Sequence, residues 1–430
     1  MIKRWALLGL LFVQAGILSA EEFSFDAAEF EKKPFELGGY FELKQDRFQL
    51  NRDAAFYKLG FYNLDQRDTL DRTTGTLELT GKYTRGIATF SFRGHADATR
   101  DSLESGQESR VYEAYASFKP DPGFTLDIGK RTLRWGKGYA WSPVGFVERP
   151  KDPNDPELSR EGYTVVAADL IRNFDGPLQT VAFTPLLLPV NSDTNGDFGK
   201  PGYLNPAAKL YFLYRDTDID LVWLGRGSRS PRFGVDFSRN LSSNLEIHGE
   251  WARIEDFEQR VSNAAGEVTT RQGSVTSSLL GLRYLSENDT TTIIEYYRNG
   301  TGYSEAQMGD FYSFVDKGVT QFQATASDAL LQRALNLSQG GYGRPNAMGR
   351  YLYARISQKE PLDILYFTPS VTAIVNLDDR SFSLTPELLY SGITNLELRF
   401  RLYALSGGSR TEFGEKQNLR RVELMARYYF

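Results

Sequence analysis

Cysteine is absent from all 430 residues of the chain. Disulfides, thiolate metal sites, a cysteine nucleophile and an N-terminal lipid-modified cysteine are therefore excluded. Long apolar runs are missing too, because no stretch after the first 20 residues approaches 18 consecutive apolar residues. The sequence thus predicts no transmembrane helix.

Residues 1–20 have two basic residues, then a short apolar run, then small residues that end at Ala20. This order predicts a secretory signal peptide that is cleaved after Ala20. An uncleaved membrane anchor is the alternative, but the apolar run is short for a membrane span. The expected domains are the signal peptide, a periplasmic N-terminal segment over 21–34, and a single domain over 35–430.

Groups that could support catalysis are scarce. Only two histidines occur, His95 and His248, and no GxSxG nucleophile motif is present. His248 alternates with Glu246 and Glu250, which is compatible with a metal site, but a hydrated wall is the favoured interpretation. The sequence therefore predicts no enzyme, no metal and no cofactor, and the net charge of −5 argues against nucleic acid as a partner.

The C-terminal stretch ELMARYYF alternates between two kinds of side chain and ends on Phe430. Leu424 and Tyr428 fall on an apolar face, whereas Glu423 and Arg427 fall on the other. A soluble sandwich strand and a lipid-facing barrel strand both give this alternation. Aromatic residues make up 13% of the chain although its mean hydropathy is only −0.41. Both values suit a barrel whose strands face lipid on one side and water on the other.

Similar alternation recurs along the whole chain and predicts about 18 strands, most of them close to the length that a tilted membrane-spanning strand needs. The predicted strands are 35–46, 74–84, 86–97, 108–119, 123–135, 161–172, 177–189, 207–215, 218–225, 232–240, 244–254, 275–286, 290–299, 349–358, 363–376, 380–390, 394–406 and 418–430.

Connections between these strands alternate in length. Short turns alternate mostly with longer connections, which include 136–160, 190–206, 255–274, 300–348 and 407–417. Short periplasmic turns and long external loops are typical of an antiparallel up-and-down barrel in an outer membrane. Only a closed barrel satisfies every strand hydrogen bond in lipid, so this is the predicted fold.

Residues 127–163 form the densest segment, with four prolines and charges of both signs. We expect a stiff loop that folds into the lumen and narrows it. The alternative is an external loop that is held by its own salt bridges. The side chains predicted to line the passage are Arg131, Trp135, Lys137, Trp141, Arg149, Lys151 and Arg160.

The RxxxWGxG pattern at Arg131–Gly138, the proline-rich loop after it and the aromatic C-terminus together resemble outer-membrane porin-type families. The chain is most similar there to alginate-export-like barrels and to barrels of the DUF1302 type, over roughly residues 108–163. The resemblance implies an 18-stranded barrel that conducts a polar, anionic or aromatic solute. Alginate exporters usually have tyrosine-glycine where this chain has Trp135-Gly136, which argues against alginate.

Alternation also sorts the charges that should face the lumen. One wall is expected to be acidic and the other basic, which would place a transverse field across the pore. Local neutralisation by facing pairs is the other interpretation. The acidic set is Asp236, Glu246, Glu250 and Glu295, with Arg283 among them; the basic set is Arg355, Arg399, Arg401, Arg421 and Arg427, with Glu397 and Glu423 as partners.

Two segments are not strand-like. Residues 327–337 carry leucines at helical spacing after a serine and an aspartate, which predicts a helix. Within the loop 300–348 it could be a lid, a plug or an outward surface helix. Residues 53–64 could be a strand extension or a loop element.

The function predicted from the sequence is a porin-like channel in the outer membrane of a Gram-negative bacterium. Its expected partners are outer-membrane lipid, a small-molecule solute and, through the strand that ends at Phe430, the barrel assembly machinery. Two other functions stay open: a secretion conduit for a polysaccharide or lipid that works with periplasmic proteins, and a closed barrel for surface assembly or adhesion.

Overall fold

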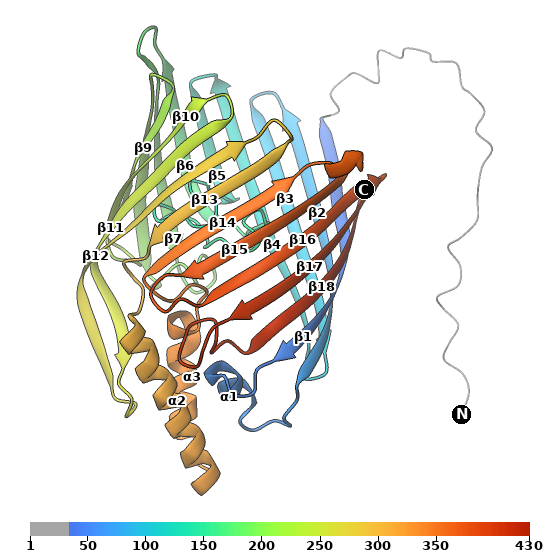
Figure 1. Cartoon of the computed structure of the whole chain (residues 1–430). Helices are drawn as coiled ribbons and strands as arrows, with labels where there is room; N and C mark the ends of the chain where they lie inside the picture. Colours follow the sequence, from blue (N-terminus) through green and yellow to red (C-terminus); the bar gives the residue numbers. More distant parts are fainter. Residues whose placement is uncertain (1–33) are drawn as a thin grey trace, which may run out of the picture. The chain divides into compact units, whose positions relative to one another are not determined.

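The computed structural model describes residues 34–430. Within them 18 antiparallel strands form one sheet, and β1 pairs with both β2 and β18, so the sheet is closed (Figure 1). The predicted signal peptide and all but the last residue of the predicted segment 21–34 lie outside the described residues.

Every predicted strand overlaps one strand of the barrel. The strands are β1 (Phe35–Leu50), β2 (Thr69–Arg85), β3 (Ala88–Asp101), β4 (Ser105–Asp121), β5 (Phe124–Arg131), β6 (Tyr163–Asn173), β7 (Leu178–Val190), β8 (Tyr203–Tyr214), β9 (Thr217–Leu224), β10 (Arg232–Ser242), β11 (Leu245–Ser262), β12 (Val268–Leu285), β13 (Thr290–Arg298), β14 (Arg350–Gln358), β15 (Phe367–Asn376), β16 (Phe382–Ile393), β17 (Leu396–Ser406) and β18 (Asn418–Tyr429).

The predicted loop 255–274 is wrong. Residues up to Ser262 continue β11, and residues from Val268 belong to β12, so the two strands form a long hairpin. The backbone pairing of β11 with β12 is interrupted by a register shift between Ile254 and Phe257 and then continues to Ser262. Backbone hydrogen bonds therefore extend the hairpin through a segment whose side chains are mostly polar. Residues 53–64 contain a short helix, α1 (Ala55–Phe61), rather than a strand extension.

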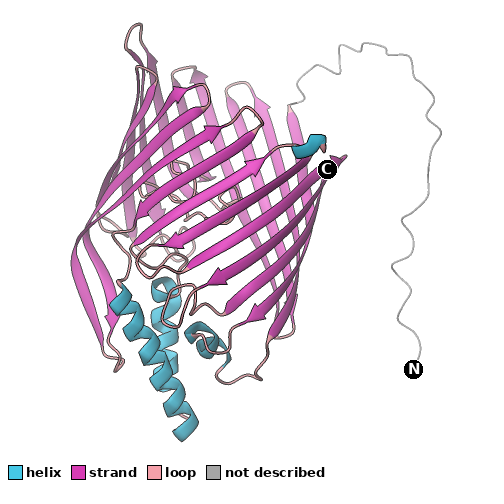
Figure 2. Ribbon diagram, viewed as in Figure 1, coloured by secondary structure: helices cyan, strands magenta, loops and turns pink. Residues whose placement is uncertain are grey.

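The long connections gather at the end of the barrel opposite the C-terminus, where the three α-helices of residues 34–430 also lie (Figure 2). The predicted helix at 327–337 is confirmed as α3 (Ala329–Leu337), but it follows a longer helix, α2 (Glu305–Thr325), which the sequence analysis missed. Ser304 and Gln307 form a capping box at the start of α2. Among residues 34–430, no helix is both long and apolar enough to cross a membrane.

The strand faces divide as the alternation predicts. On β17, Leu398 and Phe400 face outward and are each 38% exposed, whereas the side chain of Arg401 faces inward and is 5% exposed. A closed sheet with an apolar exterior and a charged interior satisfies its backbone internally and places apolar side chains against hydrocarbon. The fold is therefore a transmembrane β-barrel.

An arginine on the outer face should destabilise the barrel. We expect Phe400→Arg, in the middle of β17, to lower the free energy of unfolding in lipid vesicles by about 2–4 kcal/mol, because a cation at the bilayer midplane loses its hydration. Urea titration followed by tryptophan fluorescence measures the change. Ser117→Arg is the matched control, since Ser117 faces the lumen beside Asp127. Equal losses in both variants would contradict this assignment of faces.

Candidate functional site

Residues 132–162, between β5 and β6, fold inside the barrel and are called the lumenal loop below. The loop hydrogen-bonds to inward-facing side chains of β11, β13, β16 and β17, on strands that are far from β5 along the sheet. Its four prolines lack the backbone donor that a sheet ladder needs, so the segment is poorly suited to strand structure. The prediction of an inward fold is confirmed, and the external-loop alternative is wrong.

Glu250 of β11 binds the first part of the lumenal loop. Its carboxylate accepts hydrogen bonds from the backbone N–H groups of Gly138, at 2.6 Å, and Val144, at 3.1 Å. A Cβ on Gly138 would lie 2.2 Å from the carbonyl oxygen of Trp141, and one on Gly136 would lie 2.6 Å from a Glu250 oxygen. The two glycines of the RxxxWGxG pattern therefore allow the loop to approach the wall closely.

Glu295 of β13 holds the loop in the same way. It accepts hydrogen bonds from the backbone N–H groups of Tyr139 and of Ala140, the latter at 2.8 Å, and it lies 2.8 Å from Nε2 of His248. Glu295 is 0% exposed and Glu250 is 3% exposed. Both carboxylates are thus covered by the loop and do not line an open passage in this structure.

Asp155 fastens the second part of the loop to β17. Its carboxylate lies 2.8 Å from a guanidinium nitrogen of Arg401 and 3.3 Å from one of Arg399. The neighbouring Asn154 accepts a hydrogen bond from Thr385 of β16, at 3.2 Å. The lumenal loop is therefore continuous with β5 and β6 at its two ends and is hydrogen-bonded to β11, β13, β16 and β17 on the facing wall.

Acidification should release this attachment. Burial raises the pKa of Asp155, but Arg401 and Arg399 together lower it further, so its pKa lies below the usual range. The stabilisation from such a group is complete above the ordinary pKa of about 3.9 and is lost as the pH falls through the lower folded-state pKa. We therefore expect conductance fluctuations to increase below about pH 4 in planar bilayers.

Asp155→Asn should show those fluctuations already at pH 7 and should lose the pH dependence. Asp193→Asn, which alters an exposed carboxyl in the connection between β7 and β8, should behave like the unaltered protein. A quiet Asp155→Asn channel at pH 7 would contradict the role assigned to Asp155.

An apolar cluster joins the lumenal loop to the external helices. Trp141 stacks on Tyr297 with a centroid distance of 5.0 Å, and its indole N–H donates to Asn346 at 3.2 Å. Phe311 of α2 and Leu331 of α3 are buried in the same cluster. Part of the loop 300–348 is therefore packed onto the lumenal structure through this cluster. Helix α2 also extends away from the end of the barrel (Figure 1).

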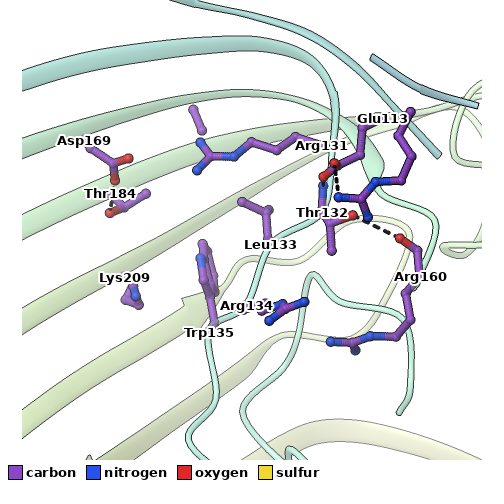
Figure 3. A pocket seen from close by; sticks show the side chains of 12 residues that line it. Glu113, Arg131, Thr132, Leu133, Arg134, Trp135, Arg160, Asp169, Thr184 and Lys209 are labelled. Carbon is purple, nitrogen blue, oxygen red and sulfur yellow. Dashed lines mark hydrogen bonds and ion pairs between the residues drawn. The ribbon is translucent and has the colours of Figure 1, made fainter. Parts of the chain in front are cut away.

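A cavity of about 430 Å³ remains between the start of the lumenal loop and the inner wall of β3–β8, and it is called the basic cavity below (Figure 3). Five cationic side chains and two carboxylates line it. Its lining residues are Arg93, Glu113, Arg131, Thr132, Leu133, Arg134, Trp135, Arg160, Ala167, Asp169, Thr184 and Lys209.

Most of these cations already have a carboxylate partner. Arg93 lies 3.0 Å from Glu113, and Arg160 lies 3.5 Å from Glu148. Arg134 is different: it is exposed in the structure and makes no ion pair with any residue of 34–430. Figure 3 shows its side chain between Trp135 and Arg160. The sequence analysis missed Arg134, although it lies within the RxxxWGxG pattern.

Of the predicted loop residues, Arg131, Trp135 and Arg160 line the basic cavity. The other four are engaged elsewhere. Lys137 pairs with Asp220 at 2.9 Å, Arg149 pairs with Asp197 and Glu161, Lys151 donates to the carbonyl of Gly138, and Trp141 is buried in the apolar cluster.

The charges of the strands are neutralised locally. Arg427 lies 2.6 Å from Glu42, Arg355 lies 3.3 Å from Glu387, and Arg401 pairs with both Glu387 and Asp155. Arg421 likewise pairs with Asp46 at 2.7 Å. Glu246 accepts from Ser238 at 3.0 Å. The four arginine pairs neutralise the predicted basic wall locally, which argues against a transverse field, whereas Ser238 is a neutral partner that leaves the charge of Glu246 in place.

No group of three or more histidine and carboxylate side chains is placed to bind a metal ion in the part of the chain that the structure describes. Nε2 of His248 lies 2.8 Å from Glu295. His248 and Glu250 are each only 3% exposed, so the favoured interpretation of this stretch as a hydrated wall is wrong for these two residues.

No family model and no curated protein matches the chain. Solved structures do. OccK5 (OpdH) of Pseudomonas aeruginosa has a TM-score of 0.53 at 13% identity, covering 92% of this chain and 98% of that chain. The outer membrane protein OprD of the same organism has a TM-score of 0.50 at 11% identity, covering 92% and 94%. At these identities the likeness shows the fold alone, which is that of outer-membrane barrels.

Proposed function

We propose that this outer-membrane barrel is a passive channel for small anionic solutes, which cross it through the basic cavity. The observation that carries the proposal is Arg134, an exposed cation that lines this cavity and pairs with no carboxylate of residues 34–430, whereas the other four lining cations each have a carboxylate partner. Cationic clefts with low-dielectric walls concentrate anions. The formal net charge of the chain is −5, so this positive region is a local feature of the lumen.

The indole of Trp135 is part of the same lining, but this residue is only 3% exposed and packs in an apolar cluster with Leu133 and Val147. It therefore supports the wall of the cavity, and the charge of Arg134 is the feature that a solute meets. The resemblance to alginate-export-like and DUF1302-type barrels stays a prediction, as does the alternative of a secretion conduit. The apolar cluster beneath α2 and α3 is less suited to a bulky polymer.

Liposome swelling tests this proposal directly. Vesicles with the purified protein should swell faster in small carboxylates, including aromatic ones, than in neutral sugars or cationic amino acids of similar size. Protein-free vesicles give the background. Equal rates for anions and cations would remove the basis for anion selection, and no swelling in any solute would favour a closed barrel.

We further propose that the barrel assembly machinery recognises the last strand through Phe430. The backbone N–H of Phe430 donates to the carbonyl of Gly39 at 3.1 Å, and its ring is 54% exposed on the barrel. Deleting Phe430 should reduce the folded, heat-modifiable fraction in outer membranes several-fold, whereas Phe430→Tyr should keep it. Normal assembly of the deletion variant would argue against this recognition.

A further inference from the structure

The connection between β14 and β15, residues 359–366, differs from the other connections at its end of the barrel. It has eight residues, whereas the other seven have two to four. It includes a single 3-10 turn, Pro361–Asp363, which Figure 1 shows at the same end of the barrel as the C-terminus. Its apolar side chains are exposed: Leu362 by 91%, Leu365 by 62%, Tyr366 by 57% and Ile364 by 47%.

The backbone of this connection is strained. Glu360, Leu362, Asp363 and Tyr366 have φ values of 49°, 58°, 58° and 61°. The left-handed region is unfavourable for residues other than glycine, because the Cβ atom comes too close to the backbone. Such strain persists only where the surrounding structure determines the conformation.

Hydrogen bonds fix the connection in place. The carboxylate of Glu360 accepts from the backbone N–H of Tyr366 at 2.8 Å. The backbone N–H of Ser391 donates to the carbonyl of Tyr366 at 3.1 Å, and the backbone N–H of Lys359 donates to the carbonyl of Asp289 at 3.2 Å. The turn is thus an ordered element that holds its apolar side chains outward.

These side chains continue the lipid-facing surface of the barrel. Ile356, just before the turn on β14, is 52% exposed, and Phe367, just after it, pairs with the outward Tyr390 on β16. Ile393, at the end of β16, is 49% exposed. Removing leucine and isoleucine side chains from water is favourable, so contact with lipid would stabilise a turn that contact with water would not.

We propose that the apolar side chains of this connection insert into the periplasmic leaflet of the outer membrane, while the exposed carboxylate of Asp363 stays in contact with water at the headgroup level. Phospholipid acyl chains cover Leu362, Ile364 and Leu365, and Tyr366 lies at the headgroup level, where tyrosine is favoured. The amine of Lys359, which precedes the apolar run, meets the anionic phosphates. The proposal rests on the membrane placement of the barrel and does not depend on the solute or on conduction.

Site-directed spin labelling tests the insertion, and the absence of cysteine makes every label unique. Leu362→Cys and, separately, Leu365→Cys carry a nitroxide in phospholipid vesicles. Ser243→Cys, in the exposed two-residue turn between β10 and β11, is the matched control. Collisions with oxygen, which enters lipid, are compared with collisions with a water-soluble nickel chelate.

We expect the ratio of oxygen to nickel accessibility to be several-fold higher at positions 362 and 365 than at 243. Dominant nickel access at both positions would overturn the proposal and leave a periplasmic protein as the partner for this surface. Swelling and conductance are measured separately, so failure here and failure of the channel function are distinguishable.

Discussion

Replacing Glu250 and Glu295 together by glutamine should raise the single-channel conductance several-fold. The two carboxylates accept four backbone hydrogen bonds from the lumenal loop, at Gly138, Tyr139, Ala140 and Val144. A hydrogen bond to a charged group contributes about 1.5–3 kcal/mol, so the four together hold the loop by several kcal/mol. In each glutamine an NH₂ group replaces one carboxylate oxygen and faces a backbone N–H donor of the loop. Two donors cannot form a hydrogen bond, and because the site is buried, water does not replace the lost bond.

The matched control for this double variant is Glu246→Gln. Glu246 lies on the same face of β11 as Glu250, but it accepts from Ser238 on β10 and not from the loop. Its conductance should stay near the unaltered value. Planar-bilayer recordings give the step size and the noise of all three proteins. A double variant with unaltered step size would show that the loop does not limit the passage or is not held by these carboxylates.

The second large effect is expected at Arg134. Replacement by glutamine should shift the reversal potential in a salt gradient towards that of a less anion-selective channel. A unit charge at about 4 Å in water is worth about 1 kcal/mol, which corresponds to roughly a fivefold change in local anion concentration. Since no carboxylate of residues 34–430 pairs with Arg134, its removal leaves no new unpaired acid behind.

Arg420→Gln provides the comparison. Arg420 is an exposed arginine of β18 on the same outer face as Val422, two residues further along the strand. This substitution removes the same charge from the chain without touching the basic cavity. An equal shift in both variants would mean that overall charge, and not the cavity, determines selectivity.

The barrel was predictable because its signal is repeated. Alternation such as that of Leu398, Arg399, Phe400 and Arg401 has the same cause in every strand, since each has one face towards lipid and one towards the lumen. Errors occurred where that cause is missing. The part of the β11–β12 hairpin between residues 255 and 274 is mostly polar, so it looked like a loop.

Helix α2 had a readable pattern that the sequence analysis did not use. Met308, Phe311, Tyr312 and Val315 recur at helical spacing and are all buried, and Ser304 with Gln307 gives the capping signature. The chain on both sides of the loop 300–348 has the period of strands, and against that background the helical period of α2 is less conspicuous than its physical signal warrants.

The site was less predictable than the fold, because alternation gives the direction of a side chain but not its partner. Glu250 and Glu295 do face inward, yet loop amides from more than a hundred residues away cover them. Arg134 was overlooked for the complementary reason. Arg134 has no ion pair within residues 34–430 because the nearby carboxylates pair with other arginines. Which carboxylate pairs with which arginine depends on the folded structure and cannot be deduced from the spacing of residues along the chain.

The central claim is that solutes pass between the lumenal loop and the wall of β3–β8. The most direct test adds a bulky charged thiol reagent to a single Arg134→Cys channel during recording, which the cysteine-free chain makes specific. Lys44→Cys, on the inner face of β1 but outside the lining of the basic cavity, is the comparison. We expect strong block of Arg134→Cys and a small effect on Lys44→Cys, whereas block of Lys44→Cys with no effect at Arg134→Cys would show that solutes do not pass through the basic cavity.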